Sequence, residues 1–289
     1  MAFRPVRSEA ATASRRYISA AALLKHVTER LYLADDTVTT FEATVERVLS
    51  SPDRLVLDRT HFYPTGGGQP HDTGAIRAAT GDGDPWRVVD VEMADTVHHA
   101  VEPADESVDA DAAALPEPGT EVVCEIDAER RAAHSRYHTA QHLLSALLLA
   151  EFDAPTTGNQ LYHDRARLDA AHDRFTGEDL DRIERRLNEI VADARAVSSY
   201  TMDRETAEAT LDTDRTRIDL LPDSIEELRI VEIAGADETD EPYDRTACAG
   251  THVGDTSEIG EVVVTGRETK GPEEERVRFA LADHVDDGE

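Results

Sequence analysis

Two pairs of side chains in this sequence have the types and the spacing of metal ligands. His138 and His142 are four residues apart, and Cys248 and His252 form a later pair with the same spacing. Residues four apart in a helix lie on one face about a turn apart, so both imidazoles of the first pair can reach one ion. Imidazole nitrogens and a thiolate suit zinc. The two pairs together predict one zinc site.

Other interpretations of these pairs stay open at this point. The histidines could be ordinary polar residues of a helix, with Cys248 a small buried apolar side chain, although the pairs use one of only two cysteines. Zinc could also be purely structural, because four protein ligands complete a tetrahedron. A metallopeptidase is disfavoured, since the HExxH pattern needs a glutamate beside the first histidine and Thr139 stands there.

Polar side chains beside the pairs could act on a substrate. Gln141 lies between the two histidines and Thr251 directly precedes the last one, and either could orient water or the substrate. For both, a packing or solvent-exposed role is equally compatible with the sequence. Gln160, in the loop expected after the first helix, is a weaker candidate for substrate binding. No general base stands out near the pairs.

The apolar pattern outlines the elements that must position these residues. The first pair lies early in a helix expected from about Ser135 to Glu151. Thr176 and Asp179 resemble a capping box before a second helix, and Asp203 begins a shorter third one. Strands are expected at residues 121–126, 229–233, 261–264 and 276–281. Helices and strands are mixed without a βαβ rhythm, which favours an α+β fold with an antiparallel sheet packed by helices.

The first part of the chain has a different pattern. Residues 31–101 contain short strand-like runs, at 39–49, 54–57 and 86–91, separated by glycine-rich turns at 66–68 and 81–83. This pattern predicts a small β-barrel. Residues 102–119 are rich in acids, alanine and proline and are expected to be a linker or an exposed loop. We therefore divide the chain into a barrel domain at 27–101, this linker, and a zinc-binding α+β domain at 120–289.

Residues 1–26 precede the barrel and carry mainly basic side chains. Their apolar core is too weak for a signal peptide. They are expected to be a disordered extension, or to lie before a true start at Val27. An arginine-rich segment that binds nucleic acid is a third alternative.

Charge is the strongest compositional feature. The chain has 61 acidic against 30 basic residues, a net charge of -31, and the acids are spread along its length. At molar salt the Debye length falls to roughly 3 Å, which screens most of the resulting repulsion. We interpret the charge as adaptation to a salt-loaded cytoplasm, as in a halophilic archaeon; an ordinary acidic surface is the alternative. No apolar run is long enough to span a membrane, and charge alone argues against nucleic acid as a partner.

Four stretches of the sequence together resemble one family. They are, in order, LYLADDTVTTFEATV, DRTHFYPTGGGQPHDTG, HTAQHLLSALL and CAGTHVGDTSEIG. Through these motifs, from about Val27 to the C-terminus, the chain is similar to the free-standing alanyl-tRNA editing proteins, the AlaX family, and to the matching part of alanyl-tRNA synthetases. It resembles the medium-sized type, because only a short segment follows His252.

The resemblance implies a fold, a cofactor and an activity. The fold is a β-barrel followed by an editing domain of the type shared with threonyl-tRNA synthetases. The cofactor is zinc, held by His138, His142, Cys248 and His252. The activity is hydrolysis of the ester in tRNA for alanine that carries serine, or glycine. The partner is that tRNA in the cytoplasm, ATP is not expected, and the protein is expected to act in trans because it lacks the aminoacylation domain.

One position departs from the family pattern. The family usually has two glycines after the cysteine, and the first of these is Ala249 here. If that position requires a positive φ, alanine would cost about 1 kcal/mol and could displace Cys248.

Discrimination against alanine requires a polar pocket. Serine differs from alanine by one hydroxyl, and a site that hydrogen-bonds this hydroxyl leaves polar groups unpaired when alanine enters. The expected wall of this pocket is the glycine-rich loop of Gly66, Gly67, Gly68 and Gln69, because glycine permits close approach of the backbone. The alternative is that this loop is only a tight turn.

Phosphate contacts need basic side chains in spite of the net charge. Arginine can bind phosphate in bidentate fashion while acids elsewhere are screened. The candidate phosphate ligands are Arg130, Arg131, Arg136, Arg276 and Arg278. Phe62 and Tyr63 could stack on bases, although a place in the core is the simpler interpretation.

Overall fold

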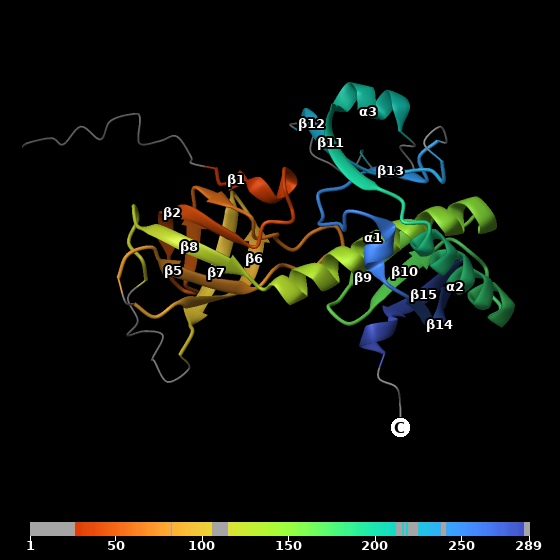
Figure 1. The fold of residues 1–289 in the computed structure, drawn as a ribbon, viewed down its shortest axis with the longest axis horizontal. Helices are drawn as coiled ribbons and strands as arrows, with labels where there is room; N and C mark the ends of the chain where they lie inside the picture. The colour runs from red at the N-terminus through yellow and green to blue at the C-terminus, as the bar shows by residue number, and fades with distance from the viewer. Residues whose placement is uncertain are drawn as a thin grey trace, which may run out of the picture.

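The computed structural model describes residues 27–81, 83–105, 115–211, 216, 218, 225–237 and 241–285. Its described part contains a closed barrel, two antiparallel sheets and three α-helices, together with short 3-10 turns and a two-residue parallel pairing of β1 (Glu29–Arg30) with β4 (Arg59–Thr60) (Figure 1). The expectation for the N-terminal extension lies outside the described residues. None of the described helices is long and apolar enough to cross a membrane.

The barrel is closed by six antiparallel strands in the order β2-β3-β7-β6-β5-β8. The alternation of apolar and polar residues along the strands produces the barrel core, because successive residues of a strand face opposite sides. In β2, Phe41, Ala43 and Val45 point into the barrel core while their neighbours face outward. The strands are β2 (Thr40–Leu49), β3 (Arg54–Leu57), β5 (Gly74–Ala78), β6 (Trp86–Met93), β7 (Val97–Pro103) and β8 (Glu121–Ile126).

The last barrel strand corrects the expected domain division. We placed residues 121–126 in the second domain, but β8 pairs with β2 on one side and with β5 on the other. Cys124 lies opposite both Phe41 and Ile76 and is fully buried in the barrel core, as expected for a small apolar side chain. A composition change at the preceding acidic segment cannot reveal this pairing, because the partner strands lie far away in sequence. Residues 106–114 of that segment are outside the described residues.

Helix α1 (Ala128–Phe152) follows the barrel directly and carries the first ligand pair. It begins earlier than expected because Asp127 caps it by accepting a hydrogen bond of 3.0 Å from the N–H of Arg130. It ends at Asp153, which has the left-handed conformation typical of a helix end. The ligands therefore lie in the middle of a long helix and not near its start.

A four-stranded antiparallel sheet packs against α1 and α2 (Gly177–Ala192). Its order is β14-β15-β10-β9, with β9 (Thr156–Leu161) at one edge, then β10 (Ala166–Ala170), β15 (Glu274–Leu281) and β14 (Val262–Gly271). The expected capping box of α2 is confirmed, since Thr176 and Asp179 hydrogen-bond each other's backbone. The largest apolar core of the molecule lies between these helices and this sheet.

A smaller three-stranded sheet lies on the other side of α1 (Figure 1). It consists of β11 (Val197–Asp203), β12 (Glu227–Ile233) and β13 (Asp244–Ala247), with the short helix α3 (Arg204–Thr210) packed on it. Asp203 caps α3 as the sequence indicates. Strand β13 ends directly before Cys248, so this sheet delivers the second ligand pair to α1.

Candidate metal centre

The four predicted ligands converge. His138 and His142 project from α1, while Cys248 and His252 lie in the loop after β13, and their ligand atoms are all within 4.8 Å of one another. The ring centroids of the three histidines are 4.5 to 5.1 Å apart. All three rings are buried. In the part of the chain that the structure describes, this is the one cluster of its kind.

The ring of His138 is oriented by Gln69 of the barrel. Oε1 of Gln69 lies 2.8 Å from Nδ1 of His138, and the same oxygen accepts a hydrogen bond of 3.1 Å from the N–H of Thr251. Because that amide can only donate, Oε1 is the acceptor and Nδ1 of His138 carries the ring proton. Its Nε2 is then free to bind a metal, and it lies 3.6 Å from Sγ of Cys248.

The other two rings are oriented in the same way. Nδ1 of His142 lies 2.7 Å from a carboxylate oxygen of Asp244, and Nδ1 of His252 lies 3.1 Å from the hydroxyl of Thr139. That hydroxyl donates its own proton to the carbonyl of Ser135, so it accepts from the ring. Each ring thus holds a proton on Nδ1, which leaves Nε2 as the nitrogen that can bind a metal. A hydrogen-bond partner that orients each metal-binding side chain is typical of metal sites in proteins.

The protonation of the cluster also fits a metal. Burial would raise the pKa of the Cys248 thiol, but His138 and His252 outweigh burial and lower that pKa well below its ordinary value. Burial would lower the pKa of His142, yet its hydrogen bonds to Asp244 and Cys248 raise it to about 10, so without a metal this ring holds a second proton that a bound metal ion would displace. Burial and the charge of His138 lower the pKa of His252 to about 3. A thiolate with three imidazoles is a donor set that suits zinc.

The loop between the second pair requires glycine at one position, and it is not the expected one. A Cβ on Gly250 would lie 2.1 Å from Cε1 of His138 and 2.8 Å from Oε1 of Gln69. Among the described residues only Ser51, Asp153 and Ala194 are non-glycine residues with positive φ, so Ala249 is not strained. The expected displacement of Cys248 by this alanine therefore does not arise.

The glycine-rich loop is a two-residue hairpin turn. Gly67 and Gly68 have φ of 58° and 85°, and Gly66 and Gln69 exchange backbone hydrogen bonds of 3.1 and 2.9 Å. Positive φ at both central positions is what a type I′ turn requires. The carbonyl of Gly68 accepts from the N–H of Leu161, at 2.8 Å, and from the side chain of Gln160, at 3.1 Å. The turn is thus bonded to the edge of β9.

The two remaining candidates have different surroundings. Thr251 is fully buried, and its hydroxyl oxygen accepts from Gln69 at 3.0 Å and from Ser135 at 2.8 Å. It belongs to the network that links the glycine-rich loop to α1. Gln141 is also buried, but its Oε1 has no hydrogen-bond partner among the described residues. Gln141 directly precedes His142 in the sequence, and its oxygen is a buried acceptor that is unpaired among the described residues.

Sequence reasoning missed the residues behind the ligands. Asp244 lies four residues before Cys248, on a strand that leads into the loop. Residues four apart along a strand lie on one face, so this spacing was the sequence signal that could have identified Asp244. Thr139 and Ser135 gave no signal beyond their helical spacing from the histidines.

The expected phosphate ligands are engaged in ion pairs or hydrogen bonds within the molecule. Arg131 is buried and bonds Asp72, so its assignment to tRNA is wrong: a side chain 4% exposed cannot reach a phosphate. Phe62 and Tyr63 lie in the core, which excludes stacking on bases. The remaining pairs are Arg136 with Asp283, Arg276 with Asp169, and Arg278 with Glu268, while Arg130 bonds the carbonyl of His71.

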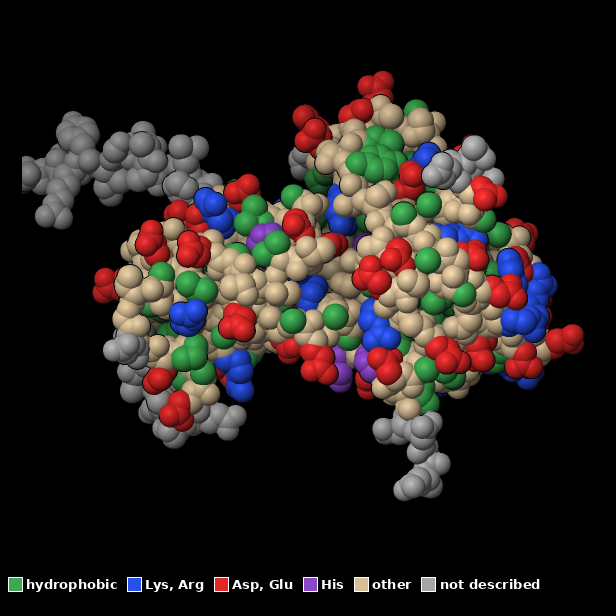
Figure 2. All heavy atoms as spheres, in the orientation of Figure 1, with side chains coloured by type: hydrophobic (Ala, Val, Ile, Leu, Met, Phe, Trp, Pro, Cys, Tyr) green, Lys and Arg blue, Asp and Glu red, His purple; other side chains and the backbone are tan. Residues whose placement is uncertain are grey.

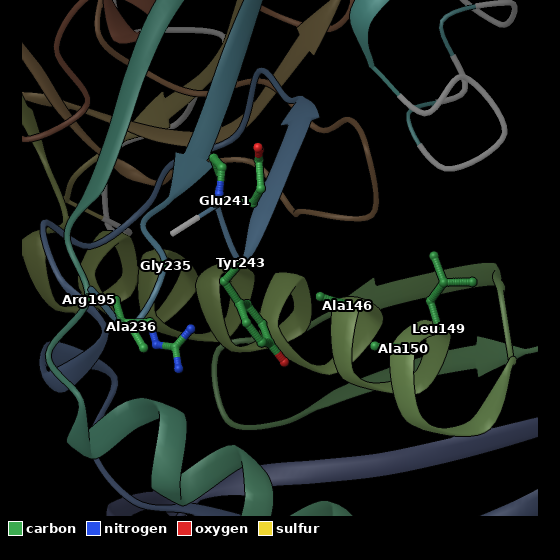
Figure 3. Close-up of a pocket in the computed structure, with 9 residues that line it drawn as sticks. Ala146, Leu149, Ala150, Arg195, Gly235, Ala236, Glu241 and Tyr243 are labelled. Atoms are coloured by element: carbon green, nitrogen blue, oxygen red, sulfur yellow. The ribbon is translucent and has the colours of Figure 1, made fainter. Parts of the chain in front are cut away.

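A cavity of about 460 Å³ lies beside the C-terminal half of α1 (Figure 3). Ala146, Leu149 and Ala150 of the helix line it together with Tyr243 and Arg195, whose guanidinium lies 4.9 Å from the centroid of the Tyr243 ring. None of the predicted site residues lines this cavity. It is therefore distinct from the metal centre, although Ala146 lies about one helical turn after His142 and Tyr243 directly precedes Asp244.

Two protein-family models match this chain, one over its first part and one within its second part. A family model described as tRNA synthetases class II (A) matches residues 11–130, and one described as threonyl and alanyl tRNA synthetase second additional domain matches residues 228–278. The second match includes both Cys248 and His252.

Whole-chain relatives carry two kinds of name. An alanyl-tRNA editing protein AlaX-M from Methanosarcina mazei is 36% identical over 90% of this chain and 98% of its own length. A protein of the same name from Methanosarcina barkeri is 36% identical over 89% of this chain and all of its own length. An alanine–tRNA ligase from Methanopyrus kandleri is 37% identical over 79% of this chain, but this region is only 23% of the ligase.

Proposed function

Because this chain belongs to the family of alanyl-tRNA editing proteins, we propose that it hydrolyses the ester of tRNA for alanine that carries serine or glycine. We place the reaction at a zinc ion held by His138, His142, Cys248 and His252. The observation that carries the proposal is the cluster itself: three Nε2 atoms and one thiolate face one point, and each ring has its own hydrogen-bond partner.

Zinc bound at this cluster would supply Lewis acidity, toward water or toward the amino group of the aminoacyl ester. The chain's own residues contribute positioning. Gln69 and Thr251 keep His138 in the tautomer that binds a metal. We assign to the unpartnered oxygen of Gln141 a hydrogen bond from the substrate, either from the serine hydroxyl or from the ammonium group.

Rejection of alanine follows from the same polar surroundings. When an alanyl ester binds, the acceptor that a serine hydroxyl would satisfy stays unpaired, and an unpaired buried acceptor costs about 1–3 kcal/mol. A glycyl ester leaves the same acceptor unpaired, so this contact favours serine over both. The turn at Gly67 and Gly68 limits the space on the barrel side. Because this turn is bonded to β9, it cannot retreat freely from a bound substrate.

The tRNA must approach a strongly acidic surface. Acidic side chains are distributed over both parts of the face in Figure 2, with arginines interspersed. We therefore propose that the protein works in the cytoplasm at high salt, where screening removes most repulsion, and that it recognises tRNA through shape more than through phosphate charge. Acting in trans is consistent with the match to nearly the full length of the editing proteins from Methanosarcina.

The deciding experiment measures release of labelled serine from seryl-tRNA for alanine in molar KCl, with alanyl-tRNA in parallel. We expect loss of serine, survival of alanine, and loss of activity in the His138→Ala variant or after chelation. The matched control is His163→Ala, an exposed histidine outside the cluster. If both esters survive while the folded protein binds zinc, the hydrolase proposal fails, and a non-catalytic tRNA-binding module with structural zinc replaces it.

A further inference from the structure

The loop that carries Cys248 and His252 is held by a residue from the opposite end of the chain. Asp36 lies in the segment between the 3-10 turn Leu31–Leu33 and β2. One carboxylate oxygen of Asp36 accepts hydrogen bonds of 3.1 Å from the backbone N–H of His252 and of 3.1 Å from the guanidinium of Arg229. The side chain of Asp36 is only 13% exposed. This carboxylate therefore bonds the metal-binding loop directly.

Arg229 extends the contact to the rest of the loop. It projects from β12, and its NH1 donates to the carbonyls of Cys248 at 3.0 Å and of Gly250 at 2.8 Å. Its side chain is 10% exposed. Asp36 and Arg229 together bind three backbone groups of the loop, two carbonyls and one amide. An irregular loop has few backbone bonds of its own, so these contacts restrict where the ligands can lie.

The backbone of Asp36 is bonded to the helix that carries the other ligands. Its carbonyl accepts a hydrogen bond of 2.6 Å from NH1 of Arg131, which lies on α1 about two turns before His138. The guanidinium of Arg131 is in turn held by the buried carboxylate of Asp72. A continuous series of bonds thus runs from α1 through Asp36 to the loop.

We propose that Asp36 is a positioning residue of the metal centre, which sets the separation between the helix-borne and loop-borne ligand pairs. A loop held in place before metal arrives does not lose conformational entropy on binding it, so affinity rises. The proposal rests on the metal binding of the proposed function, but not on the identity of the substrate. It also assigns to the segment before the barrel a direct part in building the site.

The test compares two adjacent carboxylates. Asp36→Ala removes the bonds to the loop, whereas Asp35→Ala removes the same charge from an exposed side chain whose one hydrogen-bond partner among the described residues is Thr37. Affinity for Zn²⁺ is measured by competition with a chromogenic chelator, and the cobalt–thiolate absorption band is recorded with Co²⁺. We expect Asp36→Ala to lose 10- to 100-fold in affinity, as outer-sphere partners generally do, and to weaken the cobalt–thiolate band. Asp35→Ala should bind both metals normally.

A second variant separates positioning from folding. Asp36→Ala leaves the charge of Arg229 buried without its carboxylate partner, which can destabilise the fold. The double variant Asp36→Ala with Arg229→Met has no such charge and should recover thermal stability while its zinc affinity stays low. If zinc affinity returns with stability, or if Asp36→Ala binds zinc normally, the proposal is overturned. A weak zinc site in Asp36→Ala, together with a native protein that spares seryl-tRNA, would sustain this inference while refuting the editing activity.

Discussion

The two ligand pairs share one spacing but reach the metal centre in different ways. His138 and His142 lie on α1, where the helix backbone alone places both rings on one face. Cys248 and His252 lie in a loop outside any described helix or strand. Their positions depend on contacts from β12, from α1 and from the segment before the barrel. The same four-residue spacing is thus a local property in one pair and a tertiary property in the other.

The two pairs differ in what holds their ligands in place before a metal binds. A helix of 25 residues gains its rigidity from its own hydrogen bonds and from the core beneath it. The loop has to be held by side chains from outside it. These side chains bond its backbone groups, which almost any loop residue would provide equally well. A loop-borne ligand pair is therefore more sensitive than a helix-borne one to substitutions that remove no ligand.

The largest expected effect comes from Gly250→Ala, which removes no ligand. Its Cβ would lie 2.1 Å from the ring of His138, so the loop and the helix cannot keep their present separation. Loss of one ligand from a zinc site worth about 10–16 kcal/mol corresponds to about 3 kcal/mol, on the order of a hundredfold in affinity. Titration with zinc checks this.

The matched control for that variant is Ala249→Gly at the neighbouring position. Because Ala249 does not have a positive φ, glycine relieves no strain, and zinc affinity should stay within about twofold. A large gain in affinity from Ala249→Gly, or normal binding by Gly250→Ala, would contradict this account of the loop.

The next largest effects concern the hydrogen-bond partner of one histidine in each ligand pair. Asp244→Asn removes the charge behind His142, and zinc affinity should fall about 10- to 100-fold. Thr139→Val removes only a neutral hydroxyl behind His252, a hydrogen bond of about 1 kcal/mol or about fivefold in affinity. Both variants are measured by the same chelator competition. A greater loss in Thr139→Val would reverse the ranking of the two partners.

The smallest effect concerns a third histidine on the same helix. His134 lies four residues before His138, but it is outside the ligand cluster, and its buried ring nitrogens have no hydrogen-bond partner among the described residues. Replacing it by leucine in His134→Leu should raise the free energy of unfolding by about 1 kcal/mol at pH 7.5. In the barrel, His99 has partners at both nitrogens, so His99→Leu should be destabilising there.

The pH dependence of His134→Leu follows from the same burial. Desolvation lowers the pKa of His134 from its ordinary value near 6.5 to about 3. Between these two pH values the unfolded state binds a proton at this ring and the folded state does not. Wild-type stability is therefore present above pH 6.5 and is lost as pH falls toward 3, by about 2 kcal/mol at pH 5. His134→Leu should lack this loss, as urea unfolding at pH 7.5 and 5 would show. Destabilisation at pH 7.5 would mean that a buried water pairs with the ring.

The sequence alone was enough to predict the candidate ligand cluster, the barrel and most of the regular elements. Helical and strand periodicity are local, so the capped helix at α2, the strand at residues 54–57 and the ligand pair on α1 could be read from neighbouring residues. Two ligand pairs of matched chemistry were enough to predict that distant segments meet. The sequence pattern also predicted the strand at residues 121–126, although this strand belongs to the barrel and not to the second domain.

Tertiary structure decided everything that depends on partners distant in the chain. It assigned β8 to the barrel, turned Arg131 inward onto Asp72, and made Gly250 the glycine that the site requires. It also placed Gln69 and Asp36 against the metal-binding residues. The physical reason is that hydrogen bonds and steric contacts depend on distance in space, and a sequence states only distance along the chain. A ligand can be recognised by its type, but the residue that holds it in place is recognised only by its contacts.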